Sequence, residues 1–240
     1  MGANLGPKIV RTGLVIELDA ADINSYIRTG TNWVDMARGD NGTLTNGPTF
    51  NSANGGSIVF DGTNDYVVDS SIVSFNVGCI DMWIKPTSIV NAASTSAVPI
   101  QLRYGVPTNS AWYIALGSLE ALITNEYITI VNPATNSRTF VADGGSLAAN
   151  TWVNIVINWE STIYKIYINN IVKTTISGGA GDVGQLTNPN VYYIGALDGD
   201  AGVPRSFFNG SVGITRLYNR TLTSTELLQN YNAVKSRFGL

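Results

Sequence analysis

Histidine is absent from this chain, and cysteine occurs once, as Cys79. Without histidine, nucleophilic machinery of the Ser–His–Asp or Cys–His kind is excluded, and so are histidine-ligated zinc and haem. A single cysteine forms no internal disulfide and builds no cysteine-ligated metal cluster. Because Cys79 lies in the apolar run VGCIDMWI at residues 77–84, we interpret it as an inert buried thiol rather than a nucleophile.

Charged side chains are scarce, at 13% of residues, whereas an average soluble domain has about 25%. The formal net charge is −3 at pH 7 and no basic patch is present, which argues against nucleic acid and anionic membranes as partners. No apolar run approaches the ~20 residues that a membrane-spanning helix needs. The opening residues, MGANLGPK, show no signal peptide, so we expect synthesis in a cytoplasm without Sec export.

The 240 residues are instead rich in glycine (25 residues) and aromatic side chains (10%), arranged in short alternating runs between Gly, Asn and Pro clusters. The clearest period-two alternation covers Trp152–Trp159 and Tyr164–Ile168, and Asn169-Asn170 makes the next turn. This pattern predicts a three-stranded antiparallel meander. Many short strands with regular turns predict an all-β antiparallel β-sandwich, or jelly roll.

One helix is expected, at the C-terminus over residues 223–236. Thr223 and Glu226 are spaced as a capping box, in which each side chain bonds the other residue's backbone amide. An apolar stripe follows at helical spacing, at Leu227, Leu228, Tyr231 and Val234, and we expect it to pack on the sandwich. No linker or charge block interrupts the chain, so we expect one domain over residues 1–240, beginning with an N-terminal arm at residues 1–12.

Three segments resemble the laminin G-like jelly rolls of the concanavalin A-like group. Residues Gly55–Val67 (GGSIVFDGTNDYV) are similar to that family's strand-turn-strand, and Thr151–Asn170 to its strand hairpin. Phe208–Thr223 (FNGSVGITRLYNRTLT) is similar to its closing strand. In order and spacing the resemblance covers nearly the whole chain, and it implies the jelly-roll fold.

Four further segments resemble laminin G-like proteins of tailed bacteriophages. They are Leu18–Tyr26 (LDAADINSY), Trp33–Asp35, Asn46–Phe50 (NGPTF) and Asn230–Gly239 (NYNAVKSRFG). This resemblance implies a virion component, such as a head decoration or a tail protein, which docks on other virion proteins and forms a homo-oligomer in the particle. Release on a virion would also bring a protein without a signal peptide outside the cell.

A calcium site is one hypothesis for the turn at Asp61, Asn64 and Asp65, with Asp35 as a further ligand. Calcium prefers several oxygen ligands from carboxylates, amides and carbonyls, and the laminin G-like resemblance implies calcium at the rim of the sandwich. The alternative is that these side chains simply build the turn through hydrogen bonds to the backbone. Both interpretations are left open by the sequence, and the turn is the favoured one.

A catalytic function has one weak motif in its favour. Glu17, Asp19 and Asp22 are similar to the E-x-D-x-x-E strand of glucanases in the same fold group, where two carboxylates act as nucleophile and acid. Here the last position holds aspartate, one methylene shorter, so glycoside hydrolysis is the remote alternative. We therefore expect a protein without enzymatic activity.

Aromatic rings could instead form a sugar-binding platform. Candidates in loops or near strand ends are Trp33, Tyr104, Trp112, Tyr127, Tyr192 and Tyr193, of which the first three are put forward as the site. Trp83, Trp152 and Trp159 lie in alternating strands, where a core position is ordinary for tryptophan. Two functions consequently remain: a structural virion protein that docks on other subunits, and a carbohydrate-binding adhesin that uses the same jelly roll. They are compatible with each other.

Overall fold

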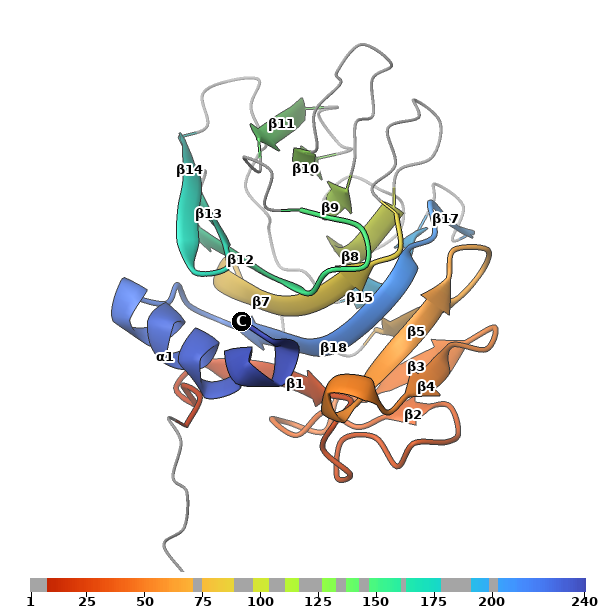
Figure 1. Cartoon of the computed structure of the whole chain (residues 1–240). Coiled ribbons are helices and arrows are strands. Elements are labelled where there is room, and N and C mark those ends of the chain that lie inside the picture. Colours follow the sequence, from red (N-terminus) through yellow and green to blue (C-terminus); the bar gives the residue numbers. More distant parts are fainter. Residues whose placement is uncertain are drawn as a thin grey trace, which may run out of the picture.

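The computed structural model describes residues 8–70, 75–88, 97–103, 111–116, 127–132, 137–142, 147–160, 163–177, 191–198 and 203–240. Over these residues the chain forms two eight-stranded antiparallel sheets packed on each other, together with a two-stranded ribbon and a C-terminal helix. Figure 1 shows the helix outside the sandwich, against the sheet that contains β7 and β18. The all-β jelly roll with a short C-terminal helix is therefore confirmed.

The first sheet is ordered β14–β13–β12–β7–β18–β5–β4, and β1 also pairs with β18. Every pairing in this sheet is antiparallel. The strands are β1 (Leu14–Asp19), β4 (Thr49–Asn51), β5 (Ser57–Asp61), β7 (Val77–Pro86), β12 (Val153–Glu160), β13 (Ile163–Ile168), β14 (Ile171–Ser177) and β18 (Asn209–Tyr218).

The second sheet is ordered β11–β10–β9–β8–β15–β6–β3–β2 and is also antiparallel throughout. Its strands are β2 (Asn32–Trp33), β3 (Gly42–Thr45), β6 (Tyr66–Asp69), β8 (Ala97–Arg103), β9 (Ala111–Leu116), β10 (Tyr127–Asn132), β11 (Ser137–Ala142) and β15 (Val191–Ile194). The ribbon pairs β16 (Leu197–Asp198) with β17 (Pro204–Arg205). A short 3₁₀ helix, η1, covers Ala53–Gly55.

The predicted meander is present as β12, β13 and β14. Ile155 lies opposite Ile168 and Ile157 opposite Ile166, so the alternation in both strands places its aliphatic side chains on one face. That face packs against the second sheet in a single hydrophobic core, to which Trp33 and Tyr192 contribute from the other side. The register is fixed because a one-residue slip would turn all of these side chains to the outside.

The outer face of the first sheet is covered as well. α1 (Ser224–Val234) and the 3₁₀ turn η2 (Lys235–Phe238) lie across it, as Figure 1 shows. Beneath them β7 is buried on both faces, because Cys79 and Trp83 point outward under the helical segment while Ile80 points into the sandwich. Cys79 is the buried thiol that its apolar run predicts, and burial, followed by the nearby Asp81 carboxylate, raises its pKa well above the ordinary value.

Trp152 is buried as expected, at 7% exposed, but under η2 rather than between the sheets. Its ring centroid lies 4.6 Å from that of Phe238. Its indole Nε1 donates a hydrogen bond of 3.0 Å to Oδ1 of Asn54 in η1. Trp152 therefore joins the C-terminal segment to the turn at Asn54, which is 98 positions from Trp152 in the sequence.

The capping box is confirmed in its geometry. Thr223 Oγ1 accepts from the Glu226 amide at 3.3 Å, and Glu226 Oε2 accepts from the Thr223 amide at 2.9 Å. The expected apolar stripe is wrong at one position: Leu227 is buried, whereas Leu228 is 44% exposed. Asn230 is buried instead, because its side chain hydrogen-bonds to Asp81 and Tyr218 beneath the helix. No helix in the described part of the chain is long and apolar enough to cross a membrane.

The pair Leu227 and Leu228 allows a test of helix packing. We expect Leu227→Ala to lower the free energy of unfolding by about 2–5 kcal/mol, because it empties a buried site between α1 and the sheet. The matched variant Leu228→Ala should cost clearly less, about 0.5 kcal/mol, since Leu228 is 44% exposed and lies outside the buried cluster. Chemical denaturation of both variants measures the difference. Equal losses would mean that the helix is not docked as described.

The described part of the N-terminal arm, residues 8–12, packs against the C-terminal segment. The Val10 amide donates to Oδ1 of Asn230 at 2.8 Å, and Tyr218 Oη donates to the Val10 carbonyl at 3.1 Å. Gln229 Nε2 donates to the carbonyl of Lys8 at 2.6 Å. The two ends of the described chain are thereby held together over the outer face of the first sheet.

A buried polar network lies under α1 and consists of Glu17, Asp81, Asn154, Arg216 and Asn230. Arg216 Nη1 lies 3.4 Å from Asp81 Oδ2, and its Nε lies 3.7 Å from Glu17 Oε1. The two asparagines donate to the Asp81 carboxylate at 2.7 and 3.3 Å. The network links β1, β7, β12, β18 and α1, so it sets how the helix sits on the sheet.

Candidate functional site

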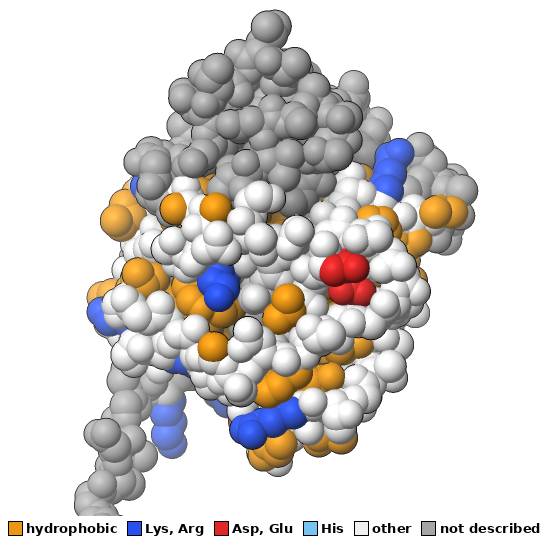
Figure 2. Space-filling view, turned by 45° about the vertical axis from the view of Figure 1, so that its right-hand side comes forward, with side chains coloured by type: hydrophobic (Ala, Val, Ile, Leu, Met, Phe, Trp, Pro, Cys, Tyr) orange, Lys and Arg blue, Asp and Glu red, His pale blue; other side chains and the backbone are white. Residues whose placement is uncertain are grey.

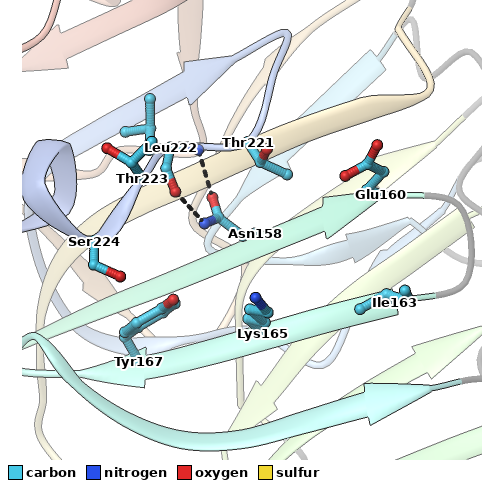
Figure 3. Close-up of a pocket in the computed structure, with 9 residues that line it drawn as sticks. All are labelled: Asn158, Glu160, Ile163, Lys165, Tyr167, Thr221, Leu222, Thr223 and Ser224. Atoms are coloured by element: carbon cyan, nitrogen blue, oxygen red, sulfur yellow. Dashed lines mark hydrogen bonds between the residues drawn. The ribbon is translucent and has the colours of Figure 1, made fainter.

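A hollow of about 430 Å³ opens on the outer face of the first sheet, beside the beginning of α1. Its floor consists of outward side chains of β12 and β13, and its wall is the segment that joins β18 to α1 (Figure 3). The residues that line it are Asn158, Glu160, Ile163, Lys165, Tyr167, Thr221, Leu222, Thr223 and Ser224.

Asn158 holds the wall of this hollow to its floor. Its Nδ2 donates to the carbonyl of Leu222 at 2.7 Å, and its Oδ1 accepts from the Leu222 amide at 3.1 Å, as the dashed lines in Figure 3 mark. One buried side-chain amide thus satisfies both backbone groups of a residue that no strand pairs with. The separation of wall and floor is therefore defined by a specific contact.

A second hollow of about 430 Å³ adjoins the first and is lined by Lys165, Tyr167, Asn170, Val172, Ser224 and Leu228. Lys165, Tyr167 and Ser224 line both hollows, so we treat them together as one outer groove. Three of its aliphatic residues, Ile163, Val172 and Leu228, are 44–55% exposed. The groove therefore combines solvent-exposed apolar surface with hydroxyl, amide and charged groups.

The lining supports binding better than catalysis. Among the described residues of the outer groove, Glu160 is the one carboxylate, so no acid and base pair faces across it. The half-buried ring of Tyr167 lies on its floor next to Lys165. A concave site with apolar surface and a few directed polar groups is what orients a small ligand.

The carboxylates of the glucanase-like segment are engaged elsewhere. Glu17 is buried and pairs with Arg11 and Arg216. Asp19 Oδ1 pairs with Arg237 Nη1 at 2.6 Å, and Asp22 accepts from the amide of Asn24 at 2.9 Å. Each of these carboxylates therefore has a structural partner.

The turn at Asp61 and Asp65 has the hydrogen bonds that its structural interpretation requires. Asp61 Oδ1 accepts from the amides of Thr63 (2.7 Å) and Asn64 (3.4 Å), and the Thr63 amide is the main cause that lowers the pKa of Asp61. Asp65 Oδ2 accepts from the Asp61 amide at 3.1 Å, while burial raises the pKa of Asp65. Among the residues described here, no three His, Cys, Asp or Glu side chains gather to hold a metal ion. Calcium binding at this turn stays a prediction.

Asp35, the further calcium candidate, is buried and organises its own loop. Its Oδ1 accepts from the amides of Glu17 (2.6 Å) and Ala37 (3.0 Å), and its Oδ2 accepts from those of Arg38 (2.8 Å) and Gly39 (3.0 Å). Four amides occupy both carboxylate oxygens. The geometry therefore gives Asp35 a structural role in joining this loop to β1.

Of the three aromatic candidates for sugar binding, Trp33 is fully buried in the core at 0% exposed. It offers no ring face to a ligand, because its position at the end of β2 directs it between the sheets. Tyr104 lies outside the described residues. Trp112 belongs to β9, but its side chain lies outside the described part of the structure.

Glu226 and Arg220 stabilise the wall of the groove through a second contact. Arg220 Nη2 lies 2.6 Å from Glu226 Oε1, and this hydrogen bond is the main cause that lowers the pKa of Glu226 from 4.5 to about 2. Because the pKa of Glu226 is lower in the folded protein than in the unfolded chain, its ionised form stabilises the fold. This contribution is fully present above pH 4.5 and is lost as the pH falls towards 2.

We therefore expect Glu226→Gln to be less stable than the original chain at pH 7, by up to ~1 kcal/mol for a partly exposed pair. Glutamine can also form the capping box, so the substitution removes the charge and keeps the hydrogen bonds at the beginning of the helix. Unfolding free energies measured from pH 7 down to pH 3 should converge below about pH 4.5. A difference that does not vary with pH would contradict the ion-pair assignment.

The two packed antiparallel sheets form a lectin-like jelly roll. The chain belongs to the concanavalin A-like lectin/glucanase superfamily, whose model matches residues 60–228, more than half of the chain. No curated protein sequence matches it. The expected laminin G-like jelly roll of the concanavalin A-like group is thereby confirmed.

Similar solved structures include several binding domains. Domain 4 of a GH43 extracellular arabinanase from Geobacillus stearothermophilus, in complex with arabinotriose, is 17% identical with a TM-score of 0.64, over 92% of this chain and 98% of that one. The botulinum neurotoxin serotype D ligand binding domain, in complex with N-acetylneuraminic acid, is 13% identical with a TM-score of 0.63, over 92% and 51%. A heptameric pentraxin from Limulus polyphemus is 13% identical with a TM-score of 0.57, over 71% and 79%.

At these identities the likeness concerns the fold. The chain spans about half the length of the neurotoxin binding domains that it resembles, and nearly all of the arabinanase domain. Two of these structures are carbohydrate complexes, with arabinotriose in the arabinanase domain and with N-acetylneuraminic acid in the neurotoxin domain, of which about half is matched.

The groove residues were not among the candidates that the sequence offers. The alternation in β13 does place Lys165 and Tyr167 on one face, opposite Tyr164 and Ile166, and this is the signal that marks them as outward. Nothing local, however, relates β13 to residues 221–224, which become its neighbours only when α1 docks.

Proposed function

We propose that this chain is a non-enzymatic recognition domain that binds a glycan in the outer groove. The observation that carries the proposal is the composition of the lining: the ring of Tyr167 lies beside aliphatic surface, hydroxyl groups of Thr221, Thr223 and Ser224 lie on the facing wall, and Asn170 adds an amide. A sugar presents apolar C–H faces and a rim of hydroxyl groups, so it matches both kinds of surface. The arabinanase domain, of which 98% is matched and which was solved in complex with arabinotriose, supports the proposal at the level of the fold.

Several observations support a role without catalysis. Glycoside hydrolysis needs two carboxyl groups about 5–10 Å apart on either side of the scissile bond. The groove presents Glu160 alone in its described lining, and Glu17, Asp19 and Asp22 are taken up by arginines or by the backbone. Glycoside hydrolysis therefore stays the remote alternative, and hydrolysis lost in Glu17→Gln would reinstate it.

A glycan array followed by calorimetry on the best ligand tests the proposal. We expect Tyr167→Ala to abolish measurable binding, because it removes the ring from the floor while leaving the buried side of β13 unchanged. Tyr193→Ala is the matched control: the ring of this tyrosine is tilted by 39° against that of Tyr66 in the second sheet, with ring centroids 5.9 Å apart. Loss of binding in the control alone would move the site to the second sheet, and no binding by the original chain would refute the proposal.

A second function, a structural protein of a bacteriophage virion, has its own support. The segments that resemble phage proteins meet at one end of the sandwich. Arg237 pairs with Asp19 and donates from Nη2 to the carbonyl of Gly56 at 2.7 Å, and the Tyr26 ring lies 5.9 Å from that of Phe50. We propose that the chain docks there on head or tail proteins as a homo-oligomer, and that it is made in the host cytoplasm.

The scarcity of charge favours docking through apolar and uncharged polar contacts. Figure 2 shows a face on which Lys, Arg, Asp and Glu side chains are few and separated by polar and small hydrophobic areas. Such contacts resist salt, because screening weakens ion pairs and leaves apolar contacts in place. Purified particles should retain this chain after washing at 1 M salt, roughly a 3 Å screening length, when it is quantified against the major capsid and tail proteins. Absence from washed particles would refute this role.

A further inference from the structure

The outer groove is not uniform in charge. Glu160 and Lys165 both line the hollow beside Thr221, but the adjoining hollow is lined by Lys165 with only uncharged residues around it. In this second half the side chains besides Lys165 are Tyr167, Asn170, Val172, Ser224 and Leu228. The groove therefore has one half with both signs of charge and one half with a single positive charge.

Lys165 is available to a ligand. Its side chain is exposed, and none of the salt bridges found among the described residues engages it. Arg216, Arg220 and Arg237, by contrast, are each paired with a carboxylate. Figure 3 shows Lys165 in the row of β13 side chains that forms the floor, between Ile163 and Tyr167. An unpaired ammonium group in the floor of a groove is placed to meet an anionic group of a bound molecule.

We infer that the outer groove selects glycans that carry a carboxylate, such as uronic or sialic acids, and that Lys165 determines this specificity. The inference rests on the glycan-binding function proposed above. The sugar ring packs on Tyr167, Val172 and Leu228, and its carboxylate accepts charge-assisted hydrogen bonds from Lys165 Nζ. Asn170 and Ser224 are left for the sugar's hydroxyl groups.

The size of the preference follows from the exposure of Lys165. An ion pair in water contributes little, whereas a hydrogen bond to a charged group in a sheltered site contributes more. A partly sheltered groove lies between these limits, so we expect an acidic sugar to bind roughly fivefold to tenfold more tightly than its neutral twin. The preference should shrink as salt is added, because the pair is partly screened.

The experiment compares two pairs of probes by calorimetry: sialyllactose against lactose, and a hyaluronan octasaccharide against the same octasaccharide with its carboxylates reduced to hydroxymethyl groups. The original chain should prefer the acidic member of at least one pair. Lys165→Gln should remove that preference, because it weakens binding of the acidic member more than that of the neutral one. Lys235→Gln is the control, since Lys235 lies over the ring of Tyr231, outside the groove lining, and it should keep the preference.

The outcomes separate the two proposals. Equal affinity for acidic and neutral members in the original chain refutes the inference and leaves the glycan-binding function standing. A preference that survives in Lys165→Gln also refutes it, once circular dichroism and the melting temperature show that the variant is folded. If neither the array nor these probes yield any binding, both the proposed function and the inference fail.

Discussion

Replacing Arg216 with methionine is expected to lower the free energy of unfolding by about 3–5 kcal/mol. Arg216 is 2% exposed and lies between the carboxylates of Asp81 and Glu17. Burial is the largest single effect and disfavours its charged form, but Asp81 together with Tyr218, Glu17 and Asp19 outweighs it, so the pKa of Arg216 is raised. Methionine fills similar space, so the loss comes from leaving buried carboxylates without their counter-charge rather than from a cavity.

The matched comparison for this prediction is Arg38→Met. Arg38 also lies near a carboxylate, 4.0 Å from Asp40, but its side chain is 42% exposed, so we expect a change of about 0–1 kcal/mol. Adding Asp81→Asn to Arg216→Met should recover part of the loss, because it removes one uncompensated charge. Denaturant titrations of the four chains measure these terms. A loss in Arg216→Met no larger than that in Arg38→Met would contradict the buried network.

Trp83→Ala is expected to cost about 3–5 kcal/mol of unfolding free energy. The indole is fully buried and stacks on the ring of Phe238, with centroids 4.4 Å apart, and on that of Tyr231 at 5.5 Å. Removing it leaves a cavity under both α1 and η2, which have few other aromatic contacts with the sheet among the described residues. The C-terminal segment should therefore loosen before the sandwich does.

The reactivity of the Cys79 thiol measures how far the C-terminal segment has loosened. It is the chain's only thiol, and it is buried in the cluster that includes Leu227 of α1. We expect a thiol reagent under native conditions to label Trp83→Ala markedly faster than the original chain, and Leu228→Ala at the original rate. Unchanged labelling together with unchanged stability in Trp83→Ala would show that the C-terminal segment does not cover the sheet.

Sequence reasoning succeeded where the signal is local. The capping box depends on residues three apart, and the β12–β13 hairpin depends on alternation over adjacent strands, so both were predictable from a short window. The same reasoning misplaced Leu228, because helical spacing defines a stripe but not the line along which a partner surface touches it. It also left Trp33 as a surface candidate, since a two-residue strand has too little alternation to show its inward side.

The outer groove could not be predicted from short sequence windows, for a related reason. Alternation identifies which residues of β12 and β13 share a face, yet it does not say what covers that face. The outer groove needs the residues that precede α1, and Asn158 meets Leu222 across 64 positions of sequence. The turn at Asp61 was recognised as a turn, whereas any role in binding calcium depends on neighbours that a sequence does not list.

The sequence by itself determined the all-β class, the meander, the start of the C-terminal helix and the exclusion of histidine- and cysteine-based chemistry. These features follow from composition and from patterns within a few residues. Only the tertiary structure decided that the outer face of the first sheet is covered, that Arg216 is buried there, and that a groove remains beside α1. Those outcomes depend on contacts such as Arg237 with Asp19, 218 residues apart, whose geometry exists only after both sheets and the helix have packed.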